Sequence, residues 1–158
     1  MVKHSLWVFF LSLLSWMPFA VLADFDCPSF REVQGEYKAV EVTRYGGGLT
    51  PREEAIGRIN KKVIVAESHF LFWDELRYED PIYEVVCHPV PQEEGEVPLP
   101  TERWGNFYGF GMHREVVKII HITPSKGEGP GLRLEIVDDE LWFFSDGWFY
   151  RMRRVSNQ

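Results

Sequence analysis

The dipeptide Asp146-Gly147 stands between two apolar, aromatic-rich runs. Both central positions of a two-residue turn of type I′ need positive φ, which glycine and aspartate tolerate better than most residues. Asp-Gly in this context therefore predicts a β-hairpin. Because a two-residue turn fixes the pairing of the strands, Ser145 is expected opposite Trp148.

A second turn at Asp138-Asp139 divides residues 132–155 into three strands, with Ile136 expected opposite Leu141. Paired residues share a face of the sheet, and successive residues alternate between faces. The face expected in the core holds Leu132, Leu134, Ile136, Leu141, Phe143, Trp148, Tyr150 and Met152. The other face holds Arg133, Glu135, Glu140, Trp142, Phe144, Phe149, Arg151 and Arg153.

On this second face, Glu135, Trp142 and Arg151 form a cross-strand row, in which the guanidinium is expected to lie on the indole and reach the carboxylate. Two interpretations stay open. The face is either a packed outer surface partly covered by the aromatic and glycine-rich segment 104–112, or an exposed patch of the composition found at binding hot spots. In the second case the binding residues are Trp104, Phe107, Tyr108, Phe110, Trp142, Phe144, Phe149 and Arg151.

Alternation and β-branched residues predict further strands at residues 35–45, 58–67, 69–73, 82–88 and 114–123, with a polar turn at 74–81. In the first of them, Tyr37, Ala39 and Glu41 are expected on one side and Val40 and Val42 on the other. The proline-rich residues 89–103 are expected to form an exposed loop.

One short helix is expected near residues 51–57, with Thr50 as its cap and Pro51 at its first position. The Gly46-Gly47-Gly48 run before it lacks the lysine and serine or threonine of a phosphate-binding loop, so it predicts a turn.

Residues 1–23 contain one formally charged side chain, Lys3, then an apolar stretch, Pro18 and the ending Val-Leu-Ala. This order is typical of a secretory signal peptide cut after Ala23, which predicts a periplasmic or secreted protein. Residues 24–158 would then be a single exported β domain without stable membrane insertion. The alternative is an uncleaved membrane anchor, since the apolar stretch is almost long enough to span a bilayer.

The chain has 2 cysteines, Cys27 and Cys87. In an oxidising compartment this pair predicts one disulfide, which would stabilise the fold by about 4 kcal/mol in the chain-entropy model. A catalytic thiol is the alternative, and export disfavours it.

The chain is acidic, with 24 Asp and Glu against 17 Lys and Arg. It therefore lacks the basic surface that nucleic acids and anionic membranes attract, whereas a basic protein partner fits. The histidines after residue 23 (69, 88, 113 and 121) have no short ligand spacing, so no metal or cofactor is predicted. His121 is expected as a hydrogen-bonded core or rim histidine. No catalytic residue is predicted, because the serines have no evident base and the acidic loop residues suggest solvation.

The Gly35-x-Tyr37 strand start, the run of antiparallel strands and an arginine near the end of the last strand together resemble lipocalin-like (calycin) β-barrels. Those proteins begin their first strand with Gly-x-Trp, and an arginine of the last strand packs over the tryptophan. The resemblance implies that Arg151 or Arg153 lies over Tyr37. The chain departs from the pattern in its tyrosine and in the helix expected between the first two strands.

The sequence thus predicts a mostly β protein, an antiparallel barrel or strongly bent sheet of about seven or eight strands with one short helix near residues 51–57. The expected function is non-enzymatic binding of a small apolar ligand in the barrel, or of a protein partner at segment 104–112 and the Trp142/Phe149 face. Alternatives are a periplasmic inhibitor or immunity protein against a basic secreted enzyme, and a small secreted hydrolase. A roomy apolar interior would favour the small ligand.

Overall fold

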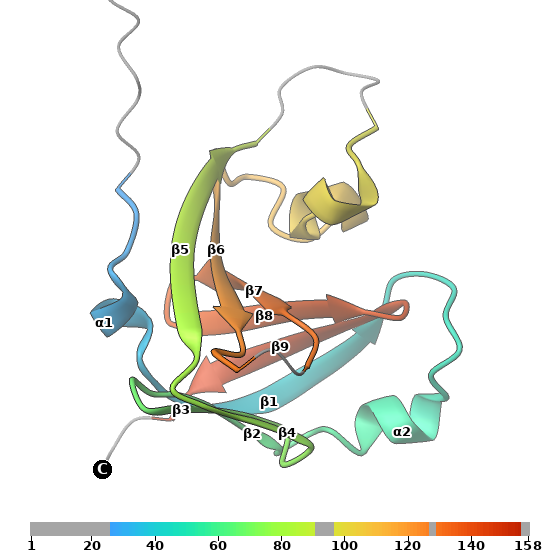
Figure 1. Cartoon of the computed structure of the whole chain (residues 1–158). Coiled ribbons are helices and arrows are strands. Elements are labelled where there is room, and N and C mark those ends of the chain that lie inside the picture. The colour runs from blue at the N-terminus through green and yellow to red at the C-terminus, as the bar shows by residue number, and fades with distance from the viewer. Residues whose placement is uncertain (1–25, 91–96, 127–128, 156–158) are drawn as a thin grey trace, which may run out of the picture.

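The computed structural model describes residues 26–90, 97–126 and 129–155. The expected signal peptide, residues 1–23, lies outside these ranges, and so does part of the expected loop at 89–103. The described residues form a mostly β fold, a curled antiparallel sheet of 9 strands, which confirms the predicted class (Figure 1). Among them, no helix has the length and apolar character needed to cross a membrane.

The elements follow one another in a simple order. The strands are β1 Gly35–Arg44, β2 Lys62–Val65, β3 His69–Phe72, β4 Leu76–Glu79, β5 Ile82–Pro89, β6 Val116–Thr123, β7 Leu132–Val137, β8 Glu140–Ser145 and β9 Trp148–Arg154. The helices are α1 Phe30–Val33 and α2 Arg52–Ile56, with 3₁₀ turns η1 Pro100–Glu102 and η2 Gly105–Tyr108.

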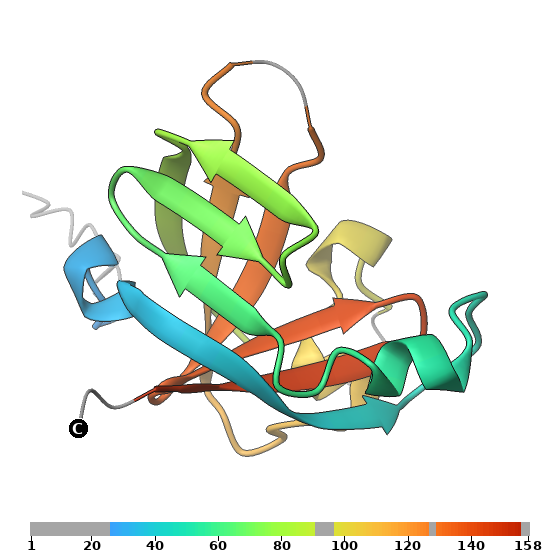
Figure 2. The same cartoon turned by 90° about the horizontal axis from the view of Figure 1, so that it is seen from below.

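The sheet is a meander joined into a half-barrel by pairing of the first and last strands. Its order is β4-β3-β2-β1-β9-β8-β7-β6-β5, so β4 and β5, consecutive in the chain, are the two ends of the sheet. Figures 1 and 2 show the curl that brings β2–β4 opposite β5 and β6. The Tyr83 hydroxyl on β5 links the two sides by donating to the Ala66 carbonyl oxygen at 2.9 Å or the His69 carbonyl oxygen at 3.1 Å.

The C-terminal hairpins have the predicted register. Ser145 pairs with Trp148, and Ile136 pairs with Leu141. Asp146 and Gly147 have φ of 47° and 78°, as a type I′ turn requires. All of the residues predicted for the core face belong to the hydrophobic core or pack against it.

Large side chains fill the concave side of the sheet. At most 2% of the surface is exposed in each of Trp73, Tyr37, Tyr150 and Phe70. The Trp73 ring centroid lies 4.7 Å from that of Tyr150 and 5.4 Å from that of Phe143. The inner face is therefore a packed core.

The disulfide between Cys27 and Cys87 is present, with the two Cα atoms 6.0 Å apart. It ties the chain before α1 to the terminal strand β5. The Phe30 ring of α1 stacks on Tyr83 of β5 at 4.3 Å between centroids. The bridge and this contact hold α1 against β5.

Several local predictions were wrong. A register shift between Ala39 and Glu41 in the β1–β9 ladder leaves Val40 exposed and moves Glu41 to the outside, while Val42 packs against the core. A β-bulge reverses the alternation in this way because it adds one residue to one strand. The strand expected at 58–67 begins only at Lys62.

The strand β4 lies where a polar turn was expected. It was not predicted because four residues with two outward charges (LRYE) give little alternation. The helix α1 and the 3₁₀ turns η1 and η2 were also not expected. Thr50 does not cap α2, whose N-cap is Pro51. Instead, the backbone N–H groups of Thr50 and Leu49 donate to the Asp146 carboxylate.

Neither Arg151 nor Arg153 lies over Tyr37. Arg154 does, with its guanidinium carbon 4.9 Å from the ring centroid, and it also donates to the Glu32 carbonyl oxygen at 2.6 Å and to the Gln34 carbonyl oxygen. The register shift in β1 and the pairing of Tyr37 with Arg154 explain the displacement.

Candidate ligand-binding pocket on the outer face

The chain between residues 97 and 115 crosses the outer, convex face of the sheet. Figure 1 shows it above β7 and β8, on the side opposite β2–β4. Glu135 of β7 fastens it, because its carboxylate accepts the Gly105 backbone N–H at 2.5 Å and lies 2.8 Å from the Arg114 guanidinium. Glu135 is 3% exposed. Burial raises its pKa, and the opposing effects of Arg114 and the Gly105 N–H do not outweigh that.

The Glu135–Trp142–Arg151 row exists in the pairing, but a different arginine completes it. Arg114 lies over Trp142, with its guanidinium carbon 5.0 Å from the ring centroid, and it makes the ion pair with Glu135. The expected role of Arg151 was therefore wrong. The partner that replaces it comes from the covering chain, whose path the sequence did not reveal.

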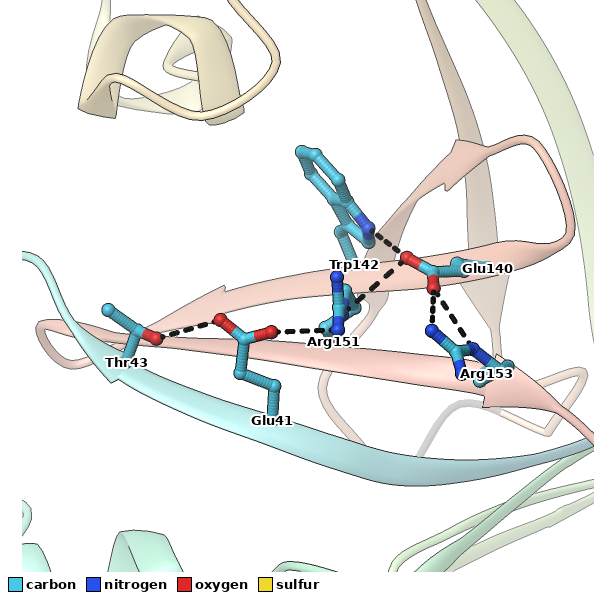
Figure 3. A network of polar contacts seen from close by, with 6 residues as sticks. All are labelled: Glu41, Thr43, Glu140, Trp142, Arg151 and Arg153. Atoms are coloured by element: carbon cyan, nitrogen blue, oxygen red, sulfur yellow. Dashed lines mark hydrogen bonds and ion pairs between the residues drawn. The ribbon is translucent and has the colours of Figure 1, made fainter.

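Arg151 belongs to a separate network, drawn in Figure 3. Its guanidinium lies 2.9 Å from the Glu41 carboxylate and 3.8 Å from that of Glu140. Glu140 also accepts from the Trp142 indole N–H at 3.1 Å and pairs with Arg153 at 3.3 Å. The charges at this part of the outer face thus neutralise one another.

The aromatic side chains of the covering chain pack on those of the sheet. Phe110 lies 4.3 Å from Phe149, and Tyr108 stacks on Phe144 at 5.6 Å, between ring centroids. Phe149 is 3% exposed, as expected from the interpretation in which segment 104–112 covers this face. Phe107 is 42% exposed. Binding by these aromatic residues stays a prediction.

A pocket of about 860 Å³ lies beside this layer. Its sheet side is formed by Val86 and His88 of β5, His121 of β6 and Arg133 of β7. The strand pairing brings these residues together, since His121 pairs with Arg133 on one side and with Glu84 on the other. The opposite side of the pocket comes from the covering chain, namely Pro98, Thr101, Glu102 and Trp104.

Trp104 sits between two polar groups of the pocket. Its ring is nearly parallel to that of His88, at 11° and 6.1 Å between centroids. The Arg133 guanidinium carbon lies 5.1 Å from the Trp104 ring centroid, and Arg133 donates to the Thr101 carbonyl oxygen. The pocket thus combines an indole, a guanidinium and imidazole rings.

His121 is partly buried at the base of the pocket. Burial lowers its pKa most, and the positive charge of Arg133 and the His88 ring lower it further, whereas Glu84 acts in the opposite direction. A lowered pKa leaves the imidazole neutral at pH 7, with one nitrogen as donor and the other as acceptor. His121 is half-buried and lines the pocket; its expected hydrogen bond stays a prediction.

Of the eight residues predicted to bind, Trp104 lines this pocket. The other seven lie in the aromatic layer or, for Arg151, in the ion-pair network. The other lining residues were not predicted to bind, among them Val86, His88, Glu102, His121 and Arg133. Their shared signal is weak, because Val86 and His88 alternate on one strand while Glu102 follows a proline-rich stretch with no periodicity.

The described residues contain no cluster of three or more His, Cys, Asp or Glu suited to a metal ion. The Ser68 hydroxyl lies 3.3 Å from His69 Nδ1, but the Glu79 carboxylate opposite His69 is bound to Arg77 at 2.6 Å. Ser68, Arg77 and Glu79 are exposed, His69 is half-buried and none of them lines the pocket, so they lend no support to the hydrolase alternative.

Comparison of the chain with known protein families, with curated proteins and with solved structures finds no match. The geometry of the pocket and the pattern of the sequence therefore carry the functional argument.

Proposed function

We propose that this protein is an exported, non-enzymatic binding protein that holds a small, largely apolar molecule in the outer-face pocket. The volume of about 860 Å³ is the observation that carries the proposal, because small-molecule sites fall in this size range. Apolar side chains from both sides contribute to its lining, among them Val86, Pro98 and Trp104. A few polar groups are placed among them, as orientation of a ligand requires.

The place of the ligand differs from the one expected in a lipocalin-like barrel. The packing of Trp73, Tyr37 and Tyr150 leaves the concave side filled, which argues against an internal ligand. A lipocalin-like architecture is still part of the proposal. It is supported by the up-and-down strand order and by Arg154, which lies over Tyr37 and binds the carbonyl groups of α1 and its C-cap.

Export to the periplasm or the medium is proposed on two grounds. The order of charge, apolar run and small residues in 1–23 is typical of a signal peptide. The Cys27–Cys87 disulfide is compatible with an oxidising compartment.

The binding proposal is tested with the neutral fluorescent probe N-phenyl-1-naphthylamine. We expect saturable fluorescence enhancement that the Val86→Phe variant reduces, because the added ring fills the pocket. Val40→Phe is the matched control, since Val40 is 42% exposed on the β1 bulge and does not line the pocket. Equal binding by both variants, or none by the parent protein at concentrations where it is folded, would contradict the proposal.

Binding of a protein partner is the second candidate. The covering chain presents exposed apolar side chains, with Val97 68%, Leu99 64% and Met112 62% exposed. Such exposed groups are found at protein interaction sites. The acidic composition of the chain suits a basic partner, such as a secreted enzyme that this protein would inhibit. Capture of a basic exported protein that Leu99→Asp abolishes and Val86→Phe does not would favour this candidate over the small ligand.

A further inference from the structure

We infer that the pocket ligand carries a single carboxylate-type anionic group, with Arg133 as its counter-charge. This inference rests on the proposed function and names the chemical class of ligand for that pocket.

Arg133 differs from the arginines that fasten the sheet. Arg58, Arg77, Arg114, Arg151 and Arg153 each have a carboxylate oxygen within 4.0 Å. Within the part of the chain that the structure describes, Arg133 has none. Its recorded contacts are the Thr101 carbonyl oxygen, reached by Nη1, and the face of Trp104. Among the described residues Arg44, Arg103 and Arg154 have no carboxylate oxygen within 4.0 Å either, but none of them lines this pocket, whereas the exposed Arg133 does.

The geometry of Arg133 leaves donors for a ligand. A guanidinium has five N–H groups in a planar fork, and the contact with Thr101 uses Nη1. To the residues that the structure describes, Nε and Nη2 of Arg133 make no hydrogen bond. This fork matches the two oxygens of a carboxylate, and stacking on Trp104 restricts the guanidinium plane.

The other charged and titratable groups at the pocket fit one monovalent anion. His121 and His88 line the pocket beside Arg133, and a neutral imidazole still supplies one N–H donor. Glu102 is the acidic side chain in the lining, and it makes no ion pair with Arg133 within 4.0 Å. Glu84 lies across from His121 on β5, on the side away from Arg133. Arg103, on the covering chain, contacts the Pro98 carbonyl oxygen and the Phe107 ring and does not line this pocket.

The same lining residues indicate a ligand with an apolar body and one charge. Trp104, Val86 and the prolines supply apolar contact, whereas one unpaired guanidinium is suited to one negative charge rather than to a polyanion. We therefore expect an organic monocarboxylate with a flat or compact apolar part.

The test compares 2-naphthoate with 2-naphthalenemethanol by isothermal titration calorimetry at pH 7.5, because the two share an apolar body and differ in charge. We expect the carboxylate to bind about two- to fivefold more tightly than the alcohol, the range for an ion pair near the surface. Arg133→Gln should remove this preference, so that in this variant the acid and the alcohol bind with equal affinity, and Arg133→Lys should restore part of it. Arg153→Gln is the matched control, because it removes an exposed arginine of the network in Figure 3.

The outcomes separate this inference from the function on which it rests. Equal affinity for the acid and the alcohol, or an equal loss of both in Arg133→Gln, would overturn the role of Arg133 while binding in the pocket stands. If neither compound binds to the folded parent protein, the proposed function itself fails. Thermal melts of each variant show whether a loss comes from unfolding.

Discussion

The turn between β8 and β9 packs closely against the loop of Gly46, Gly47 and Gly48. Gly147→Ala is therefore the most informative change to the fold. Gly147 has φ of 78°, and a left-handed conformation costs a non-glycine residue about 1–2 kcal/mol. A Cβ atom there would also lie 2.6 Å from the carbonyl oxygens of Gly46 and Gly47, closer than real Cβ contacts come. The loop would have to move.

Movement of the loop would weaken hydrogen bonds that now fix it. The backbone N–H groups of Tyr45 and Gly46 donate to the Gly147 carbonyl oxygen at 2.9 and 3.3 Å, and those of Leu49 and Thr50 donate to Asp146. Loss of two such bonds costs about 1–3 kcal/mol. Together with the backbone strain, we expect Gly147→Ala to lower the free energy of unfolding by about 2–5 kcal/mol.

Urea denaturation followed by tryptophan fluorescence, with the disulfide intact, measures this loss. Gly109→Ala is the matched control, since Gly109 has φ of 87° but no atom within 4 Å of an added Cβ. It should show the strain alone. Gly46→Ala, with neither positive φ nor a close atom, should be nearly neutral. If Gly147→Ala costs no more than Gly109→Ala, the loop contact does not stabilise the fold as argued.

Three further changes test other parts of the structure. Asp146→Asn keeps a favourable type I′ turn but removes the charge that Leu49 and Thr50 contact. Hydrogen bonds from the Thr50 side chain and from the Leu49 and Thr50 backbone lower the Asp146 pKa below 3.8, so the stabilisation is present above that pH and is lost as the pH falls through the folded-state pKa. Melts from pH 2 to 7 should therefore show a deficit of the variant at pH 7 that disappears in acid, and a constant deficit would contradict the role of the charge. Glu135→Gln should melt at or above the parent temperature at pH 7, because burial raises the Glu135 pKa above 4.5 and so disfavours the charged carboxylate in the folded protein. The parent protein gains stability as the pH falls from the raised pKa to 4.5, so the difference in melting temperature should close near pH 4.5. A large loss of stability at pH 7 would show that the ion pair with Arg114 outweighs burial. Reduction of Cys27–Cys87 should lower stability by about 4 kcal/mol, as measured in urea with and without reductant, and coincident curves would mean that the bridge adds nothing.

Local chemistry made the three C-terminal strands predictable. The turn at Asp146-Gly147 has one favoured geometry, so the register and both faces of β8 and β9 followed from it. The disulfide was predictable because the chain has 2 cysteines and thus one possible intramolecular pair.

Prediction failed where one residue changed the pattern. The irregularity at Val40 reverses the faces of β1 and carries Glu41 outward. The residues around it include no glycine or proline that would mark a bulge. For the same reason the arginine over Tyr37 is Arg154 and not a neighbour.

The pocket depends on contacts between distant parts of the chain. Residues 90–115 connect β5 to β6, and a connection of this length fixes neither the register nor the face that it covers. His88, His121 and Arg133 become neighbours only because β6 pairs with β5 on one side and with β7 on the other. The sequence placed Arg133 on the outer face and found Trp104 as a binding residue, but it did not bring the two together.

Ligand binding at the outer-face pocket is tested most directly by amide NMR of the ¹⁵N-labelled protein titrated with 2-naphthoate. The largest shift changes should fall on His88, His121, Arg133 and the Trp104 indole N–H, which surround the pocket. The amides of Trp73 and Tyr150, in the filled interior, should stay unchanged. Shifts centred on the interior residues, or no shifts at saturating ligand, would contradict a binding site on the outer face.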